Sequence, residues 1–427
     1  MQINHTRLQN GLTLVHSQDS TTQMVSTSVL YRVGSANEVP LRTGLAHLLE
    51  HLMFGGSQNA PLFDPPLQEA CGENNAFTTS DYTNYYITLP AVNIETALWL
   101  ESDRMTRLNI TDQTLEVQRK VVMEEFKLHY INQPYGDIHH LIAALCHPPG
   151  HPYSWPTIGL KLSQIADVPL EVVRDFYHRF YAPQNAILAV VGDITWERTQ
   201  ELVRKWFGAL PPSVAPSEEH GLQSWTQGAQ GWTPPGEPAT VRRIHRKTVR
   251  RRVPNNVLVV AFLTPSACDA RFKVFDVVSD LLATGKSSRL NRELVERQRL
   301  FLSIDACVLP RLGQGMLLIE GVPAEGISME QAEQALRTEV DKLRTQPIPK
   351  RELGKTLNKF EASLAAQRSD CQAVAMQLAY YTMLGSPQTY NNELAAYRAL
   401  TPRDVQQTVD EALHWRNAYV VRYLCRQ

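Results

Sequence analysis

The chain has 427 residues, too many for one typical hydrophobic core, so its length favours two domains of about 200 residues each. Hydrophobic residues make up 43% of the chain and charged residues 20%, as in an ordinary globular protein. The formal net charge of -1 creates no global field that would attract nucleic acid or an anionic membrane, so we expect neither as a partner.

The N-terminal stretch "MQINHTRLQNGLTLVHSQDS" has no charged segment followed by an apolar one, so we expect a first strand there and no signal peptide. No apolar run in the sequence reaches the roughly 18 residues that a transmembrane helix needs. The cysteines are scattered without a CxxC pair, which fits reduced thiols. Together these features predict a cytoplasmic protein.

A β-type run, "MVSTSVLYRVGSAN", precedes a leucine-rich helix in "TGLAHLLEHLMFGGS", residues 43–57. Thr43 is the expected N-cap of this helix, because its side chain can accept a hydrogen bond from a free backbone N–H of the first turn. Gly55 and Gly56 are expected to end it, since glycine tolerates the left-handed conformation that follows a helix. The leucines between these limits are expected to face the core.

His47, Glu50 and His51 stand at positions i, i+3 and i+4, so their side chains share one face of the helix. Two imidazoles one turn apart can bind a single Zn²⁺, and the glutamate lies close enough to take a proton from water activated there. The alternative is a set of satisfied core or surface residues, but unliganded imidazole and carboxylate groups would be costly to bury. The pattern H-x-x-E-H is the inverted zincin motif and favours a zinc site.

A catalytic zinc site needs a third protein ligand and one open position. The helical segment "EVQRKVVMEEFKLHY" offers two candidates, Glu124 and Glu125. Glutamate pairs on a solvated helix face are common, and spacing alone does not decide which carboxylate would point at the metal.

A stretch rich in Pro, Gly, Ser and Gln, residues 211–240, separates two halves with a similar order of elements. In each half a buried strand is followed by a loop, a helix and a glycine-containing turn, which indicates an internal repeat of roughly 200 residues. Strands and helices do not alternate regularly enough for a doubly wound sheet. The pattern predicts an α+β fold, with each half a mainly antiparallel sheet that has helices packed on one face.

A basic run, "VRRIHRKTVRRR" at residues 241–252, follows this stretch. It could bind a polyanion, which would give binding a steep salt dependence. The near-neutral charge of the whole chain favours the simpler interpretation of a solvated strand face.

Several motifs, taken in order, resemble those of one peptidase family: "HLLEHLMFGGS", "GENNAFTTSDYTNYY", "WLESDRM", "QRKVVMEEF", "HPYSWPTIG" and "YAPQNAILAVVGDI". The chain is similar over essentially its whole length to the pitrilysin-type zinc metallopeptidases, the family of insulin-degrading enzyme and the mitochondrial processing peptidases. The resemblance implies two homologous domains, a zinc-bearing one at residues 1–212 and a second at 241–427, joined by a linker at 213–240. Such a chain would form half of a clamshell that encloses extended, unstructured peptides and hydrolyses them.

The resemblance also assigns roles near the motif. His47 and His51 would bind one zinc ion per chain, and Glu50 would be the general base. The family register makes Glu125 the third ligand and leaves Glu124 as the alternative.

Two further features belong to the same comparison. Gln118 stands where the family often has a glutamate, and it would support the ligands by hydrogen bonding from outside the coordination sphere. The resemblance implies that "NNAFTT" is an edge strand beside the site, whose Asn75, Ala76 and Phe77 would pair with the backbone of an extended substrate.

The family's second domain usually supplies an Arg and a Tyr that bind the substrate carbonyl or oxyanion. In "ELVERQRLFLSI" these positions are Val295 and Leu302. The neighbouring Arg297 and Arg299 stand out of register, and Arg289 or Arg297 is the candidate that could substitute for the missing Arg. The resemblance therefore implies a heterodimer in which a second family chain supplies the pair, with a homodimer as the alternative. Some relatives are non-catalytic structural or chaperone-like subunits, but those typically have eroded zinc motifs.

Overall fold

The computed structural model describes residues 1–212 and 244–426. These residues form two compact units. The first unit comprises Met1–Lys127, the described part of Trp155–Gln223, and Ser363–Glu393; the second comprises Leu128–Ser154, the described part of Ser224–Ala362, and Leu394–Gln427. The predicted linker, residues 213–240, lies outside the described residues, as do residues 241–243 of the basic run.

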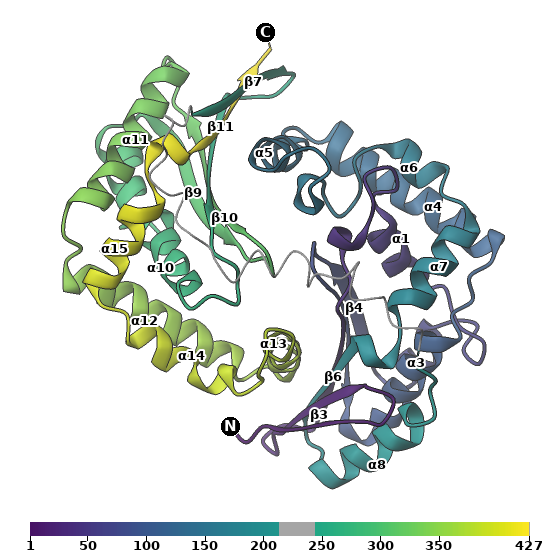
Figure 1. Ribbon diagram of the computed structural model, residues 1–427. Helices are drawn as coiled ribbons and strands as arrows, with labels where there is room; N and C mark the ends of the chain where they lie inside the picture. The colour runs from purple at the N-terminus through teal and green to yellow at the C-terminus, as the bar shows by residue number, and fades with distance from the viewer. Residues whose placement is uncertain (213–243, 427) are drawn as a thin grey trace. The chain divides into compact units, whose positions relative to one another are not determined.

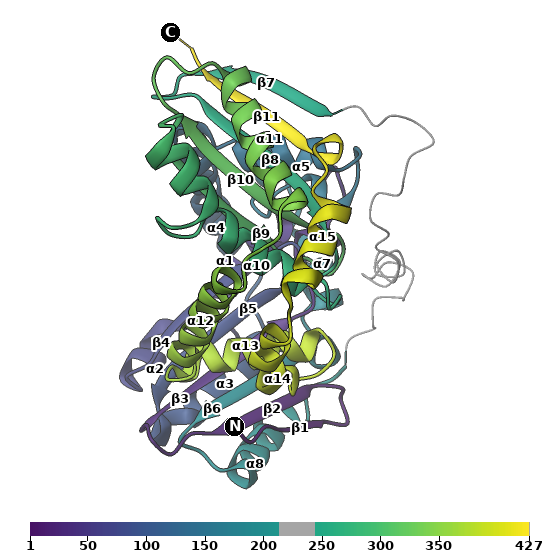
Figure 2. The same cartoon turned by 90° about the vertical axis from the view of Figure 1, so that its left-hand side faces the viewer.

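The first unit contains a six-stranded sheet with the strand order β1-β2-β6-β3-β5-β4. Neighbouring strands are antiparallel except for β2 and β6, which are parallel. Figure 2 shows β3, β6, β2 and β1 lying side by side. The bounds are β1 (Asn4–Arg7), β2 (Thr13–Gln18), β3 (Met24–Tyr31), β4 (Glu73–Thr78), β5 (Thr83–Pro90) and β6 (Ala186–Gly192).

The central strands of this sheet are buried on both faces, and the edge strand β4 is not. Every residue of β6 is buried, and so is every residue of β3 after its first. By contrast, β4 has only half-buried and exposed residues. The sheet therefore buries its centre and leaves β4 available at one edge.

Helices cover both faces of the first sheet. Figure 1 shows α3, α7 and α8 on one side and α13 on the other. The helices of the first side and its margins are α1 (Leu45–Leu52), α2 (Asp64–Glu69), α3 (Ile94–Thr106), α4 (Asp112–Phe126), α6 (Leu162–Ala166), α7 (Leu170–Phe180) and α8 (Trp196–Phe207). Helix α13 (Cys371–Met383) lies between α12 (Lys350–Gln367) and α14 (Thr389–Arg398) along the chain.

The second unit contains a five-stranded sheet with the order β7-β11-β8-β10-β9, in which only the β7–β11 pair is parallel. Figure 2 shows β7 beside β11 at one edge. The strands are β7 (His245–Arg251), β8 (Val257–Thr264), β9 (Phe301–Leu309), β10 (Gly315–Pro323) and β11 (Tyr419–Cys425). One face packs on α10 (Phe272–Ala283), α11 (Met329–Thr345) and α15 (Pro402–Ala412), and the other on α5 (Ile138–Cys146).

The predicted α+β fold with two mainly antiparallel sheets is confirmed. The prediction that helices cover only one face of each sheet is wrong, because one helix packs on the opposite face of each. Helix α5 belongs to the first half of the chain, yet Ile138 and Ile142 are buried in the core of the second sheet. Helix α13 belongs to the second half, yet Val374 and Leu378 are buried in the core of the first sheet. The predicted limits of 1–212 and 241–427 therefore separate the sheets but not these two exchanged helices.

The described part of the basic run forms the edge strand β7. Arg246 forms an ion pair with Glu333 at 2.6 Å, and Arg251 pairs with Asp137 at 3.0 Å. Charged side chains on an edge strand also discourage pairing with other chains. The structure thus accounts for part of the run without a polyanion.

Candidate metal centre

Helix α1 begins after Gly44, whose φ of +91° is in the left-handed region that favours glycine. The predicted N-cap at Thr43 is wrong, because Gly44 occupies the N-cap position and the Thr43 hydroxyl accepts from the Leu160 backbone N–H at 2.8 Å instead. The capping group is the buried carboxyl group of Glu38, whose oxygens accept from Gly44 N at 3.0 Å and from Ala46 N at 2.8 Å. Burial raises the pKa of Glu38 to about 8, although these backbone donors oppose the shift.

The turn after α1 is held by a buried carboxylate on α3. Helix α1 ends at Leu52 with Met53 as its C-cap, so the predicted stop at Gly55 and Gly56 is wrong; Gly56, with a φ of +95°, belongs to the turn that follows. Asp103 accepts hydrogen bonds from the Ser57 hydroxyl at 2.6 Å and from the Asn59 backbone N–H at 2.9 Å. These bonds fix the exit of α1 against α3.

The motif "WLESDRM" also contains a fully buried ion pair. Arg104 is 1% exposed and donates to both oxygens of Glu101, at 2.5 Å and 2.9 Å. The guanidinium carbon also lies 4.4 Å from the ring centroid of Phe63 and 4.5 Å from that of Tyr85. This packing explains how α3 carries two charges inside the first unit.

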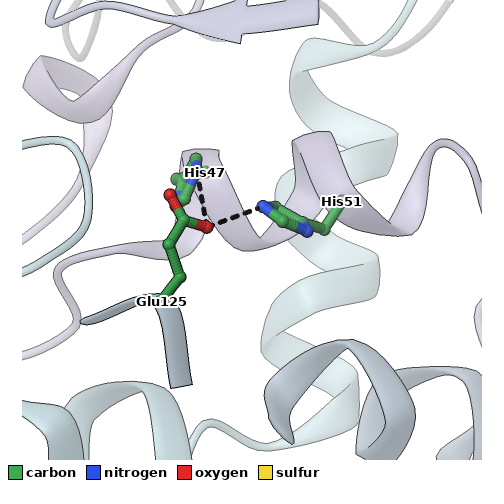
Figure 3. Close-up of side chains that lie close together, drawn as sticks. All are labelled: His47, His51 and Glu125. Atoms are coloured by element: carbon green, nitrogen blue, oxygen red, sulfur yellow. Dashed lines mark ion pairs between the residues drawn. The ribbon is translucent and has the colours of Figure 1, made fainter. Parts of the chain in front are cut away.

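Three donor atoms from two helices converge beside α1. The Nε2 atoms of His47 and His51 lie 3.8 Å and 3.3 Å from Oε2 of Glu125, which α4 supplies. Figure 3 shows the Glu125 carboxylate reaching toward both rings. One donor atom from each residue lies within 4.8 Å of the others.

This donor set fits zinc. Two imidazole nitrogens and one carboxylate oxygen are a ligand set of catalytic zinc sites. A tetrahedral zinc with bonds of about 2.0–2.1 Å keeps its ligand atoms roughly 3.4 Å apart. The observed separations of 3.3 Å and 3.8 Å are close to that value.

The structure separates the two glutamates that spacing left open. The Glu124 side chain is 72% exposed and pairs with Lys127 at 2.6 Å, whereas Glu125 faces the histidines. Adjacent residues on a helix point about 100° apart, so only one of them can face α1. Gln118 is half-buried two helical turns before Glu125 on the same helix.

The local electrostatics suit a metal ligand next to a base. Burial, aided by nearby His51 and opposed by Glu125, lowers the pKa of His47 to about 4. His47 is therefore neutral at physiological pH, which is the form that binds metal. Burial also raises the pKa of Glu50, an effect that the Thr78 hydroxyl and His51 oppose and Glu125 reinforces. A carboxylate with a raised pKa is a stronger general base.

We expect the Glu125→Gln variant to bind zinc more than about 10-fold more weakly than the wild-type chain, because it removes an anionic ligand atom. The Glu124→Gln variant should keep wild-type affinity, since its side chain is exposed and paired with Lys127. Zinc content after gel filtration and competition with a chromophoric chelator measure the difference. A larger loss of zinc in the Glu124→Gln variant would reverse the assignment.

Strand β4 carries the predicted substrate-binding residues at the edge of the first sheet. Its only strand partner among residues 1–212 and 244–426 is β5, with Ala76 opposite Tyr85. The backbone N–H of Ala76 donates to the side chain of Asn75 at 2.8 Å, and the ring of Phe77 contacts the ring of Tyr82. The prediction of an edge strand is confirmed, whereas its use by substrate stays a prediction.

The second unit places no arginine or tyrosine at the two positions that differ from the family pattern. Val295 packs against the core, and Leu302 at the start of β9 is 59% exposed. Arg289 is engaged by both oxygens of Glu352 at 2.8 Å. Arg297 pairs with Glu293 on its own helical turn.

Sequence reasoning missed two residues near the site. Glu38 caps α1 from a loop that precedes the helix, and no local spacing pattern predicts such a cap. Thr78 stands within the motif "NNAFTT", but nothing in that motif indicates that its hydroxyl contacts Glu50. Both contacts depend on how separate segments pack.

Two family models match the chain. The model described as "Insulinase (Peptidase family M16)" matches residues 13–137, and the model described as "Peptidase M16 inactive domain" matches residues 167–360.

Within the described residues, no helix combines the length and the apolar character needed to cross a membrane.

Individual proteins match as well. The zinc protease PqqE of Helicobacter pylori is 26% identical over 95% of this chain and 88% of its own length. The mitochondrial-processing peptidase subunit beta of Saccharomyces cerevisiae is 27% identical over 49% of this chain and 45% of its own length. The crystal structure of a protease from Helicobacter pylori has a TM-score of 0.87 at 26% identity and covers 99% of both chains. The pitrilysin structure, with a TM-score of 0.74 at 18% identity over 99% of this chain and 45% of its own, shares the fold.

Proposed function

The chain belongs to the insulinase family of M16 peptidases, and we propose that it is the zinc-bearing subunit of a two-chain endopeptidase that hydrolyses extended peptides. The observation that carries this proposal is the convergence of His47, His51 and Glu125 beside Glu50. Relatives named zinc proteases support the peptidase class.

The residues of the site have different roles in the proposed hydrolysis of a peptide bond. Zinc held by His47, His51 and Glu125 would supply a Lewis acid for the scissile carbonyl and lower the pKa of water in the open position. Glu50 accepts the proton of the attacking water and passes it to the leaving amine. His47 and His51 would be the nitrogen ligands, and the Glu125 carboxylate would balance part of the positive charge.

The edge strand β4 determines the class of substrate in this proposal. A peptide that adds to β4 through main-chain hydrogen bonds must be extended, and such pairing makes few demands on its side chains. The residues directly before Thr78 on β4 are Asn75, Ala76 and Phe77, and Thr78 contacts the proposed base. Strand addition would therefore deliver a backbone beside Glu50.

The second subunit follows from what the second unit of this chain lacks. Preorganised donors at a developing oxyanion typically contribute on the order of 3 kcal/mol each to transition-state stabilisation. Val295 and Leu302 cannot donate a side-chain hydrogen bond. A second family chain with the Arg and Tyr would complete the site, whereas a homodimer would not.

We expect the purified chain alone to bind zinc and to be weakly active or inactive on a library of unstructured fluorogenic peptides. Adding a family chain that carries the Arg and Tyr should raise activity by about 100-fold or more, as expected for a missing oxyanion donor. Gel filtration of the mixture and the rate of peptide cleavage measure assembly and activity. Full activity from a monodisperse homodimer would contradict the heterodimer.

A non-catalytic subunit of the same family is the second candidate function. The match to a model described as an inactive domain and the residues Val295 and Leu302 favour it. The two candidates differ in metal content and in the effect of removing metal. About one tightly held zinc per chain, with activity of the assembled enzyme lost to a chelator and restored by zinc, supports the peptidase.

A further inference from the structure

The hydroxyl of Thr78 donates a hydrogen bond of 2.5 Å to Oε2 of Glu50. Glu50 is 9% exposed, so this bond is made largely out of water. We propose that Thr78 is a positioning residue, which holds the Glu50 carboxylate in place relative to the metal ligands and to the substrate strand. This inference rests on the proposed peptidase function, because it assigns Thr78 to the orientation of the proposed base.

The direction of the hydrogen bond follows from the available protons. An ionised carboxylate only accepts, so the proton in the Thr78–Glu50 bond comes from Thr78. The neighbouring hydroxyl of Thr83 donates to the carbonyl of Val33 at 2.9 Å, so its single proton is used elsewhere. Thr83 lies 3.4 Å from the Thr78 hydroxyl, much farther than the carboxylate. The Thr78 proton is therefore directed at Glu50.

The backbone that presents Thr78 is rigidly held. Thr78 is the last residue of β4 and pairs with Thr83 at the closed end of the β4–β5 hairpin. In the turn that follows, Thr79 N donates to Tyr82 O at 2.8 Å. Ala36 N donates to Ser80 O at 2.8 Å, which fastens this turn to the segment before α1.

The close approach of that segment depends on a glycine. A Cβ at Gly34 would lie 2.4 Å from the Thr79 carbonyl oxygen and 2.5 Å from that of Ser80. Only a residue without a side chain lets the two backbones come so near. A donor on such a fixed support limits the movement of its acceptor.

The acceptor belongs to a second fixed element. Glu50 lies on α1, whose first turn is capped by Glu38 and whose exit is held by Asp103. Rotation about its side-chain bonds is the freedom that remains for Glu50, and the Thr78 hydrogen bond restricts it. Because Thr78 directly follows Asn75–Phe77, the same strand would align the substrate and orient the base.

Substitutions at Thr78 separate hydrogen bonding from packing. The Thr78→Val variant keeps the branched shape and loses the donor, whereas Thr78→Ser keeps the donor and loses a methyl group. The matched control is Thr27→Val on β3, a fully buried threonine whose hydroxyl has no hydrogen-bond partner among the described residues. The same chemical change there should leave the site unaltered.

In kinetic measurements on the assembled enzyme, we expect Thr78→Val to lower kcat by about 10- to 100-fold with KM within about 3-fold, since a bond to a charged group is lost and substrate pairing is kept. Thr78→Ser should recover most of kcat, and Thr27→Val should match wild type. Equal kcat values for Thr78→Val and wild type, or a loss confined to KM, would overturn the proposal.

A second readout does not depend on activity. Crystal structures of the full wild-type chain and of both Thr78 variants should show Glu50 in one ordered position in wild type and Thr78→Ser, and in another rotamer or several in Thr78→Val. An unchanged, equally ordered Glu50 in Thr78→Val would overturn the proposal. If the wild-type assembly cleaves no peptide, the proposed function fails, and these structures still decide whether Thr78 positions Glu50.

Discussion

The Glu50→Gln variant is expected to lose peptidase activity by about 10²- to 10⁴-fold and to keep its zinc, because an amide cannot take a proton from water. The retained zinc follows from geometry, since the convergent donor atoms come from His47, His51 and Glu125. The amide oxygen can still accept the Thr78 hydrogen bond, so the fold of the site should persist. Zinc content and the rate of peptide cleavage by the assembled enzyme measure the two effects separately.

The matched control is Glu124→Gln, the same chemical change on an exposed side chain of α4. It should retain both zinc and activity. Near-normal turnover in the Glu50→Gln variant would show that another group is the base. Loss of zinc in that variant would instead show that Glu50 contributes to metal binding.

The Arg104→Met variant is expected to lower the free energy of unfolding of the first unit by about 3–5 kcal/mol, because it leaves the Glu101 carboxylate buried without its partner. Glu101 is 0% exposed, so water cannot replace the lost hydrogen bonds. The rings of Phe63 and Tyr85 also lose their cation. Urea denaturation followed by zinc release, which reports on the first unit because His47, His51 and Glu125 all belong to it, measures the change.

Two comparisons make this result specific. Arg179→Met breaks an exposed ion pair with Asp175 on α7 and should cost less than about 1 kcal/mol. The double variant Arg104→Met with Glu101→Leu should regain much of the lost stability, since it removes both charges. Equal losses for Arg104→Met and Arg179→Met would mean that the buried pair is not a major source of stability.

The local part of the site could be predicted because helical periodicity alone places it. His47, Glu50 and His51 share a face at any orientation of α1, so their grouping needs no tertiary information. The edge position of β4 was implied by the family resemblance of "NNAFTT", since its residue pattern by itself fits any ordinary strand. The continuous apolar runs in the sequences of β6 and β8 predict buried strands.

The tertiary structure decided what depends on partners far along the chain. Spacing left Glu124 and Glu125 equivalent and only the family register favoured Glu125, whereas the packing of α4 against α1 is what turns its carboxylate toward the histidines. Glu38 can cap α1 only when the loop that carries it folds back on the helix. The local sequence does not show this contact, and the N-cap was therefore predicted at Thr43.

The exchange of α5 and α13 has the same origin. The apolar face of a helix predicts that the helix is buried but does not specify which sheet it packs against, because the hydrophobic effect is not directional. The sequence by itself therefore determined the metal-binding motif, which follows from spacing along one helix, and the α+β fold, which follows from the order of strand and helix patterns in the two halves. The third donor, the helix cap and the hydroxyl that touches Glu50 were decided by packing, since each joins residues whose proximity exists only once the elements have come together.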